Sequence, residues 1–229
     1  MYANTHTTAS ATGMQTTLFR AEARSIVRRA LGCENNRDAV LFTGTGCTGA
    51  IGKMVDLLKG TPRWRAANAA GARPLVVVGP YEHHSNLLPW RENGCLVVAV
   101  REAQGGGVDM DHLESVLREH ADATLKIGAF SAASNLTGIL CDTVAISVML
   151  HRHKALAFFD YATAGPYTTI NMNPVVADPA QAPFAYKDAV FLSPHKFVGG
   201  VGTPGVLAFK KEILHSAVAF GEGAPPALP

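Results

Sequence analysis

Several residue types on which whole classes of protein depend are scarce in this sequence. It contains only four cysteines, and no two of them form a CxxC pair or share metal-ligand spacing. This scarcity argues against a disulfide framework and against a zinc site, and it predicts reduced thiols in a cytoplasmic protein. The four are Cys33, Cys47, Cys95 and Cys141.

Charge is also sparse, at 17% of residues, and nearly balanced, with a formal net charge of +2. Lys and Arg are scattered and form no basic run, so we expect neither a nucleic-acid nor a membrane partner. No segment is long and apolar enough to span a bilayer, and residues 1–17 lack the features of a secretory signal. With 48% hydrophobic residues, the chain can still bury a substantial core. These features favour a globular protein whose partner is a small molecule.

What the sequence does contain is a repeated alternation of short apolar runs with amphipathic segments. This alternation predicts an α/β fold with a mostly parallel central sheet and helices on both faces. The strands are expected at residues 75–78, 96–100, 125–130, 155–160, 189–192 and 206–209.

Helical spacing and capping residues predict four helices around these strands. The first covers residues 21–31 and ends at Gly32, and the second covers 50–58. A third runs through Leu117 from a capping box at Asp111 and Glu114, and Thr143 is expected to cap a fourth at 144–154.

The first candidate for chemistry is Lys196, in a Ser-Pro-His-Lys tetrapeptide that follows the apolar run 190–192 and precedes a glycine-rich stretch. Ligands of open α/β sheets bind at the carboxyl ends of the strands. Apolar neighbours such as Phe197 and Val198 would disfavour the charged ammonium and supply the neutral amine that a Schiff base needs. Taken alone, the tetrapeptide fits an ordinary surface lysine better.

A carboxylate, Asp160, ends the apolar run 155–159 at the same edge of the expected sheet. An anion there could pair with a pyridine nitrogen and keep it protonated, so that the ring could withdraw electrons from a substrate carbanion. Taken alone, Asp160 fits a helix cap or a turn equally well.

A run rich in Gly and Thr, residues 41–49, leads into the expected helix near Ala50. Free backbone N–H groups and a positive helix end would attract an anion, for which phosphate is the natural candidate. Further donors are Thr43, Thr45 and Thr48. An ATP-binding P-loop is disfavoured, because five residues rather than four separate Gly46 from Gly52 and Met follows Lys53. A loop that serves only for tight turning remains the alternative.

The fourth segment, residues 81–86, places His83 and His84 shortly after the strand expected at 75–78. An imidazole can stack on a pyridine ring and transfer protons near neutral pH. Adjacent histidines seldom converge on one metal ion, and no nearby Cys or Asp completes a ligand set. A surface turn is the alternative for the pair alone.

In this order and spacing, the four segments resemble the class V aminotransferase, or cysteine desulfurase-like, family of fold-type I enzymes that depend on pyridoxal 5′-phosphate (PLP). The resemblance covers about residues 41–209, and its most specific parts are at 82–86 with Pro89-Trp90, 134–138, 159–160 and 193–196. It implies the large domain of that fold, with three αβα layers, at 37–215. An N-terminal arm and helix would occupy 1–36 and a Gly/Pro-rich tail 216–229, with the C-terminal small domain absent.

The resemblance also implies roles for the matching residues. Lys196 would form the Schiff base, Asp160 would pair with the pyridine nitrogen, and His83, or alternatively His84, would stack on the ring. Thr163 stands where many relatives carry Gln, so the usual hydrogen bond to the cofactor's phenolic oxygen must be weaker or rearranged. The other matches are Asn135 near that oxygen, Gly46, Cys47, Ser193 and His195 at the phosphate, and Thr203 at the phosphate of the neighbouring subunit in a homodimer.

These matches predict a PLP-dependent enzyme that acts on an amino acid by transamination or by cysteine desulfurase-like lysis. Family members are longer, and their C-terminal domain supplies the arginine that grips the substrate carboxylate. A truncated fragment that binds cofactor or a partner without turnover is therefore the alternative. No cysteine falls at the mobile-loop position that delivers sulfur in desulfurases, so desulfurase activity is unsupported by the sequence.

Overall fold

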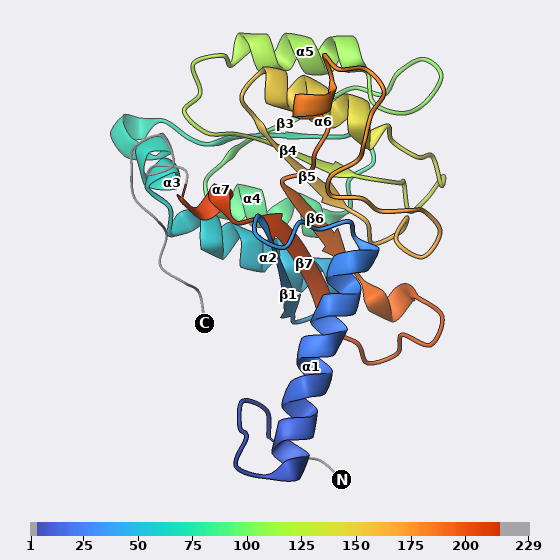
Figure 1. The fold of residues 1–229 in the computed structure, drawn as a ribbon. Coiled ribbons are helices and arrows are strands. Elements are labelled where there is room, and N and C mark those ends of the chain that lie inside the picture. The colour runs from blue at the N-terminus through green and yellow to red at the C-terminus, as the bar shows by residue number, and fades with distance from the viewer. Residues whose placement is uncertain (1–3, 216–229) are drawn as a thin grey trace.

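The computed structural model describes residues 4–215, and the strands within them form one sheet (Figure 1). The strands are β1 (Asp38–Thr43), β2 (Leu75–Val78), β3 (Leu96–Ala99), β4 (Lys126–Ser131), β5 (Leu156–Asp160), β6 (Ala189–Leu192) and β7 (Gly205–Lys210). Their order across the sheet is β1-β7-β6-β5-β4-β2-β3. The five strands from β3 to β6 in that order are parallel, and β7 runs antiparallel to both β6 and β1. The mostly parallel sheet predicted from the sequence is confirmed.

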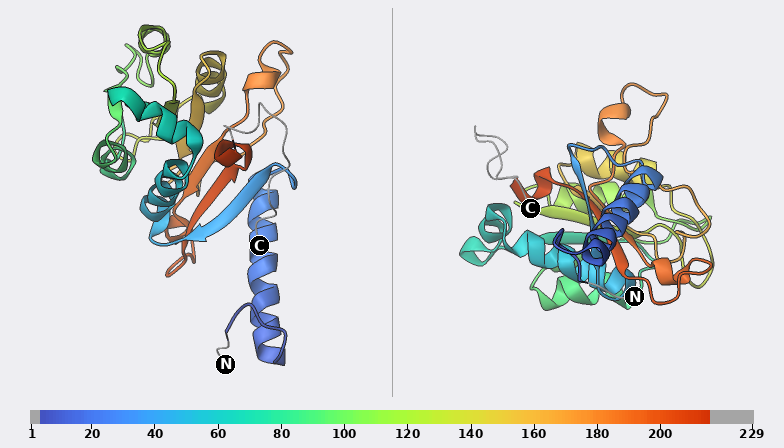
Figure 2. Two further views of the ribbon diagram at one scale, coloured as in Figure 1. Left: turned by 90° about the vertical axis from the view of Figure 1, so that its left-hand side faces the viewer. Right: turned by 60° about the horizontal axis from the view of Figure 1, so that its bottom comes forward.

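Helices cover both faces of the sheet, as the views in Figure 2 show. They are α1 (Ala11–Ala30), α2 (Gly46–Lys59), α3 (Pro62–Ala67), α4 (Leu88–Glu92), α5 (Met110–Glu119), α6 (Thr143–Arg152) and α7 (Glu212–His215). Alternate strand residues face opposite layers. Val76 and Phe158 pack in the core that contains α2, whereas Val77 and Phe159 pack in the core that contains α5 and α6. The chain therefore has the three layers that were expected.

The strand bounds agree with the predictions to within one residue wherever a strand was expected, but β1 was not expected at all. The expected loop at 41–49 is correspondingly wrong in extent, because β1 continues to Thr43 and α2 begins at Gly46. Helix α1 begins ten residues before the predicted start at position 21. Two predicted caps are also wrong: Asp109 caps α5 and Asp142 caps α6 through side-chain bonds to helix N–H groups.

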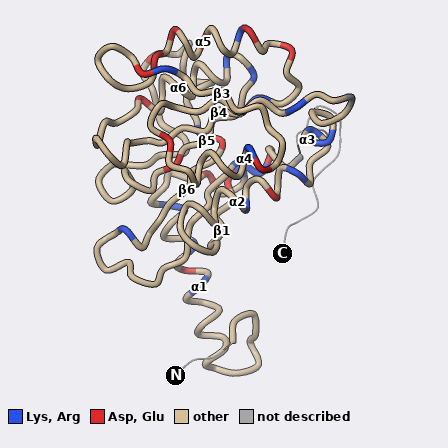
Figure 3. Tube along the Cα trace, turned by 180° about the vertical axis from the view of Figure 1, so that it is seen from behind, with Lys and Arg blue, Asp and Glu red and all other residues tan. Residues whose placement is uncertain are grey.

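Helix α1 projects away from the sheet at its N-terminal end (Figures 1 and 2). Its exposed apolar side chains are Met14, Leu18, Phe19 and Ile26. The helix lies within the N-terminal unit predicted at 1–36, whereas the predicted tail at 216–229 lies outside the described residues. No helix among residues 4–215 is long and apolar enough to cross a membrane. Basic and acidic positions are interspersed around the described chain rather than gathered by sign (Figure 3).

Buried charges lie at the sheet edge where β6 begins. Asp38 opens β1 and Lys210 ends β7, and the two residues face each other in the strand register as a fully buried ion pair of 2.8 Å. Asp188, just before β6, pairs with His151 at the end of α6. The residues expected to carry chemistry lie at the opposite edge, where β4, β5 and β6 end.

Candidate functional site

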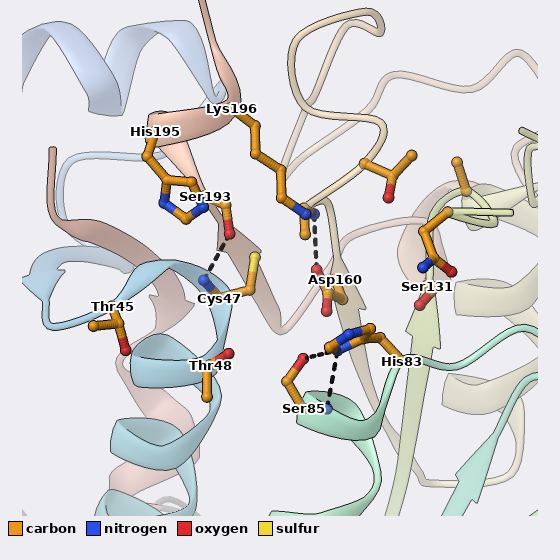
Figure 4. A pocket seen from close by; sticks show the side chains of 14 residues that line it. Thr45, Cys47, Thr48, His83, Ser85, Ser131, Asp160, Ser193, His195 and Lys196 are labelled. Carbon is orange, nitrogen blue, oxygen red and sulfur yellow. Dashed lines mark hydrogen bonds between the residues drawn. The ribbon is translucent and has the colours of Figure 1, made fainter. Parts of the chain in front are cut away.

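A cavity of about 170 Å³ opens where β4, β5 and β6 end and α2 begins. A cavity of about 150 Å³ suffices for benzene, so the space is large enough for one six-membered ring. Figure 4 shows Lys196, Asp160 and His83 converging on this cavity from three separate elements. Its walls are formed by Thr45, Cys47, Thr48, His83, Ser85, Ser131, Ala133, Asn135, Asp160, Ala162, Thr163, Ser193, His195 and Lys196.

Lys196 lies on a short 3₁₀ turn, Pro194–Lys196, that follows β6. Pro194 opens the turn, and the Lys196 amide donates to the carbonyl of Ser193. The turn then reverses at Gly200, where a Cβ atom would come within 1.9 Å of the Pro194 carbonyl oxygen. Only glycine fits there, so the glycine tail fixes the direction in which the lysine leaves the strand.

The apolar shielding expected around Lys196 is not present in this chain. Lys196 is exposed at the mouth of the cavity, Val198 is fully exposed, and Phe197 is only half-buried, with its ring packed near Gly165. Phe197 instead packs against the core near Gly165 and Val198 lies in solvent, so neither side chain covers the lysine.

Asp160 ends β5 and is buried, with 4% of its surface exposed. Its Oδ1 accepts a hydrogen bond from the Ala162 amide at 2.7 Å. Burial raises the pKa of Asp160, and the bond from Ala162, the Cys47 thiol and the charge of Lys196 oppose that rise. Among residues 4–215 no cationic side chain forms an ion pair with it. A buried carboxylate of this kind is suited to a ligand that brings its own positive N–H group.

His83 lies on the turn after β2 and forms another wall of the cavity. Its Nδ1 accepts a hydrogen bond from the Ser85 amide at 3.2 Å and lies 2.9 Å from the Ser85 hydroxyl oxygen. An amide N–H can only donate, so Nδ1 must be unprotonated and the ring proton must sit on Nε2. His84, the alternative from the sequence, does not line the cavity.

The first turn of α2 lies at the cavity, where the sequence predicts an anion cradle. Thr45 precedes the helix without capping it through its side chain, and the Cys47 amide donates to the Ser193 hydroxyl at 2.9 Å. Gly46 has φ +54°, and a Cβ there would come within 2.7 Å of both His195 and Ser193 side chains. These contacts bring the two halves of the predicted phosphate site together at a helix N-terminus.

The structure brings together most of the predicted site residues. Eight line the cavity directly, and Gly46 lies against it through the contacts just described. Thr203, which was predicted to reach the phosphate of a neighbouring subunit, lies outside this cavity: it is exposed, and its hydroxyl donates to the Gly200 carbonyl at 2.6 Å. The eight are Cys47, His83, Asn135, Asp160, Thr163, Ser193, His195 and Lys196.

Sequence reasoning missed Ser131, a buried residue of the cavity wall. The strand was predicted to end one residue earlier, at 130, although a hydroxyl at the carboxyl end of a central strand was the available signal. It also gave no role to Glu82, whose carboxylate binds Ser131 from behind the wall. No group of three or more potential metal ligands occurs in the described part of the chain.

Comparison with known proteins gives consistent results. Residues 1–224 match the family model for class-V aminotransferases. A probable cysteine desulfurase of Halalkalibacterium halodurans is 28% identical over 205 residues, covering 87% of this chain and 45% of the relative. One from Chlamydia muridarum is 27% identical over 197 residues, covering 84% and 43%. The chain thus spans less than half the length of these curated relatives.

Solved structures show the same fold. The apo cysteine desulfurase of Thermococcus onnurineus NA1 superimposes with a TM-score of 0.70 at 20% identity, over 92% of this chain and 47% of that one. A NifS-like protein of Rickettsia africae gives 0.68 at 19% identity, over 89% and 50%. At these identities the likeness supports the architecture, and the chemistry has to be argued from the cavity itself.

Proposed function

Because the chain belongs to the class-V aminotransferase family, whose members depend on PLP, we propose that its cavity holds PLP for chemistry on an amino acid. The observation that carries the proposal is that Lys196 and Asp160 share one ring-sized cavity with the N-terminus of α2. An amine, an anion and a phosphate cradle are the three features that an aldehyde-bearing pyridine phosphate requires.

The residues present fit this cofactor. Lys196 would hold its aldehyde carbon, Asp160 its ring nitrogen, and His83 the face of its ring. The Gly46 amide and the side chains of Ser193 and His195 would hold its phosphate, and the Cys47 amide would keep the Ser193 hydroxyl in place beside it. Near the phenolic oxygen, Asn135 would be the main donor, with the shorter Thr163 beside it. When bound, PLP withdraws electrons from the substrate's α-carbon and so weakens the bonds to that atom.

The chain's own side chains then have distinct tasks. Asp160 would keep the ring nitrogen protonated, for which it is suited because it is buried and forms no ion pair within residues 4–215. The Lys196 amine, once released by the incoming amino group, would take up and return the proton of the α-carbon. His83 is a poor base in this conformation, because its Nδ1 already accepts from Ser85 and its Nε2 carries the proton.

The substrate class is suggested in part by the two curated relatives described above, both of which carry the name probable cysteine desulfurase. Cys47, the cysteine that lines the cavity, is 3% exposed, and burial raises the pKa of its thiol far above the usual range. A thiol that stays protonated is a poor nucleophile and would not accept sulfur from a substrate. We therefore propose proton transfer at the α-carbon of an amino acid as the step this chain supports, leading to transamination or lysis.

The experiment is to add PLP to the purified chain and follow its absorption spectrum, then reduce with borohydride and locate the adduct by peptide mapping. We expect a new visible band, and an adduct on Lys196 that is absent in Lys196→Ala. Lys53→Ala, which changes an exposed lysine of α2, is the matched control and should label normally. An adduct on another lysine, or none, would refute the assignment.

Adding an amino acid to the loaded protein separates binding from turnover. A change in the visible band together with a keto or sulfur product supports the enzyme. A stable band without product instead supports the alternative, a chain that binds cofactor but does not turn over substrate.

A further inference from the structure

Glu82 lies directly before His83 and behind the wall of the cavity. Its Oε1 accepts from the amides of Ser131, at 2.7 Å, and Gly79, at 3.3 Å. Its Oε2 accepts from the Ser131 hydroxyl at 2.7 Å and from Asn86 Nδ2 at 2.6 Å. One carboxylate therefore receives four hydrogen bonds.

These bonds join the segment after β2 to the end of β4, which is 49 positions from Glu82 in the sequence. Gly79 follows β2, Ser131 ends β4, and Asn86 belongs to the 3₁₀ turn His84–Asn86. Ser131 and His83 both line the cavity. A charged acceptor forms stronger hydrogen bonds than a neutral one. The Glu82 carboxylate is therefore well placed to fix the position of the Ser131 wall relative to the His83 wall.

The carboxylate is also placed so that it can lose its charge. Burial raises the pKa of Glu82 to about 7, even though the bonds from Ser131 and Asn86 lower it, and the charge of Asp160 at the end of β5 adds to the rise. Cys141, in the segment after β4, also faces Glu82, and His83 follows it on its own turn. The ionised and neutral forms are thus both accessible near neutral pH.

Asn86 offers a partner for either form. Its Nδ2 donates to the ionised carboxylate, while its Oδ1 is buried and has no hydrogen-bond partner in the described part of the chain. Rotation of the amide would turn Oδ1 toward Glu82, where it could accept the proton of a neutral carboxyl group. Ser131 can adapt in the same way by rotating its hydroxyl.

We propose that Glu82 is a positioning residue: its carboxylate fixes His83 and Ser131 at the wall of the cavity, and loss of its charge reorganises that wall through Asn86. Its importance for cofactor binding rests on the proposed function, whereas its control over the His83 turn does not.

The test compares Glu82→Gln, Glu82→Ala and the control Glu102→Gln in the full chain. Gln can satisfy every partner, by donating to Ser131 Oγ and to Asn86 Oδ1, but it cannot titrate. Glu102 bonds the hydroxyl of Tyr81, one residue before Glu82, on the surface. The readouts, without cofactor, are the NMR signals of the Ser131 backbone amide and the Asn86 side-chain amide between pH 5.5 and 8.5, because both groups donate to the Glu82 carboxylate, and the ¹⁵N signals of the His83 ring at pH 8. The Kd for PLP is measured over the same pH range.

In the unaltered chain and in Glu102→Gln, we expect the Ser131 and Asn86 signals to change around pH 7, whereas in Glu82→Gln they should not. Because PLP has ionisable groups of its own, its Kd is compared at each pH with the Kd of Glu82→Gln, and the ratio of the two values should change around pH 7. In Glu82→Ala the ¹⁵N signals of the His83 ring at pH 8 should differ from those of the unaltered chain, and the Kd at pH 8 should rise by about tenfold, the effect of one buried donor left unpaired.

Unchanged His83 signals and an unchanged Kd in Glu82→Ala at pH 8 would overturn the proposal, as would a change of the Ser131 and Asn86 signals near pH 7 that persists in Glu82→Gln. If Glu82→Ala does not fold, the pH profile of Glu82→Gln decides. If no variant binds PLP but the His83 signals behave as described, the proposed function fails while the role of Glu82 stands.

Discussion

Burial raises the pKa of both carboxyl groups at the cavity, Asp160 and Glu82, but their hydrogen-bond partners differ. Asp160 accepts one amide hydrogen bond and faces the space where a ligand would lie, whereas Glu82 accepts four bonds and faces the protein. The charge on Asp160 can therefore be compensated by a bound cation. That on Glu82 is stabilised only by dipoles from the chain itself, and its pKa stays near 7.

This difference predicts how stability responds to pH. The pKa of Glu82 is raised from 4.5 to about 7 in the folded state, so its contribution is fully present below pH 4.5 and is lost as pH rises to about 7. The loss amounts to about 3 kcal/mol. Glu82→Gln has no carboxyl group to ionise at this position, so it lacks this loss. In chemical unfolding, the unaltered chain should therefore lose about this much unfolding free energy relative to Glu82→Gln between pH 4.5 and 8. Glu102→Gln should show no such trend, and a parallel course for Glu82→Gln and the unaltered chain would contradict the prediction.

At the scale of elements, the pairing of α6 with the start of β6 depends on the charge of His151. Its Nδ1 and Nε2 lie 2.8 Å from the Phe184 carbonyl oxygen and from Asp188 Oδ2. Both neighbours are acceptors, so both ring nitrogens must donate, which requires the imidazolium form. Burial lowers the pKa of His151, but the hydrogen bond and charge of Asp188 outweigh it, and the net direction is upward.

A group with a raised folded pKa stabilises below its unfolded pKa, here about 6.5, and that stabilisation is lost as pH rises through the folded value. His151→Gln should therefore be most destabilising near pH 6, by about 3–5 kcal/mol as for one partner removed from a buried ion pair, and less so at pH 9. Urea unfolding at both pH values measures this. His153→Gln, at the same helix end and 3.9 Å from Glu114, should have a small effect at either pH. Equal costs at pH 6 and 9 would show that His151 is neutral.

The edge strand β1 is held by a charge pair rather than by apolar contacts alone. Lys210→Met leaves Asp38 buried and unpaired, and should cost about 3–5 kcal/mol in unfolding free energy. The double variant Asp38→Leu with Lys210→Met replaces both charges with apolar groups, so it should recover most of that loss. A double-mutant cycle by denaturant titration measures the coupling. Additive losses would mean that the two charges do not depend on each other.

The same pair explains why β1 escaped prediction from the sequence. A strand that opens with Asp38 and runs into a Gly/Thr loop looks like part of the loop, because the partner that neutralises the carboxylate lies 172 positions away at Lys210. The start of α1 was missed for a local reason, since its first ten residues include three Thr and one Gly, which favour helix weakly. Strands with uniformly apolar runs, β2 and β6, were predicted to the residue.

The candidate site shows the same difference between residues that local sequence patterns predict and residues that depend on distant partners. Lys196, Asp160 and the α2 cradle could be predicted because each stands at a strand end or a helix start, and topology brings those ends to one edge. Ser131 and Glu82 could not, because their roles depend on hydrogen bonds across 49 positions of sequence. The exposure of Lys196 likewise depends on the path of the glycine tail, which no local pattern specifies.

For the whole molecule, the elements that meet at the cavity lie far apart in the sequence, so a ligand that bridges them should stabilise the entire fold. PLP would contact α2, the His83 turn and the ends of β5 and β6 together. At 100 times its Kd, a ligand specific for the folded state adds about 2.7 kcal/mol, which for a chain of this size corresponds to about 5–10 °C in Tm. Thermal unfolding with and without PLP measures the shift.

Pyridoxal lacks the phosphate and inorganic phosphate lacks the ring, so each should give only a small part of the shift in Tm. Lys196→Ala should lose most of the shift that PLP gives. A full shift with phosphate alone would show that the site recognises only an anion. Equal shifts in Lys196→Ala and the unaltered chain would show that the amine does not hold the cofactor.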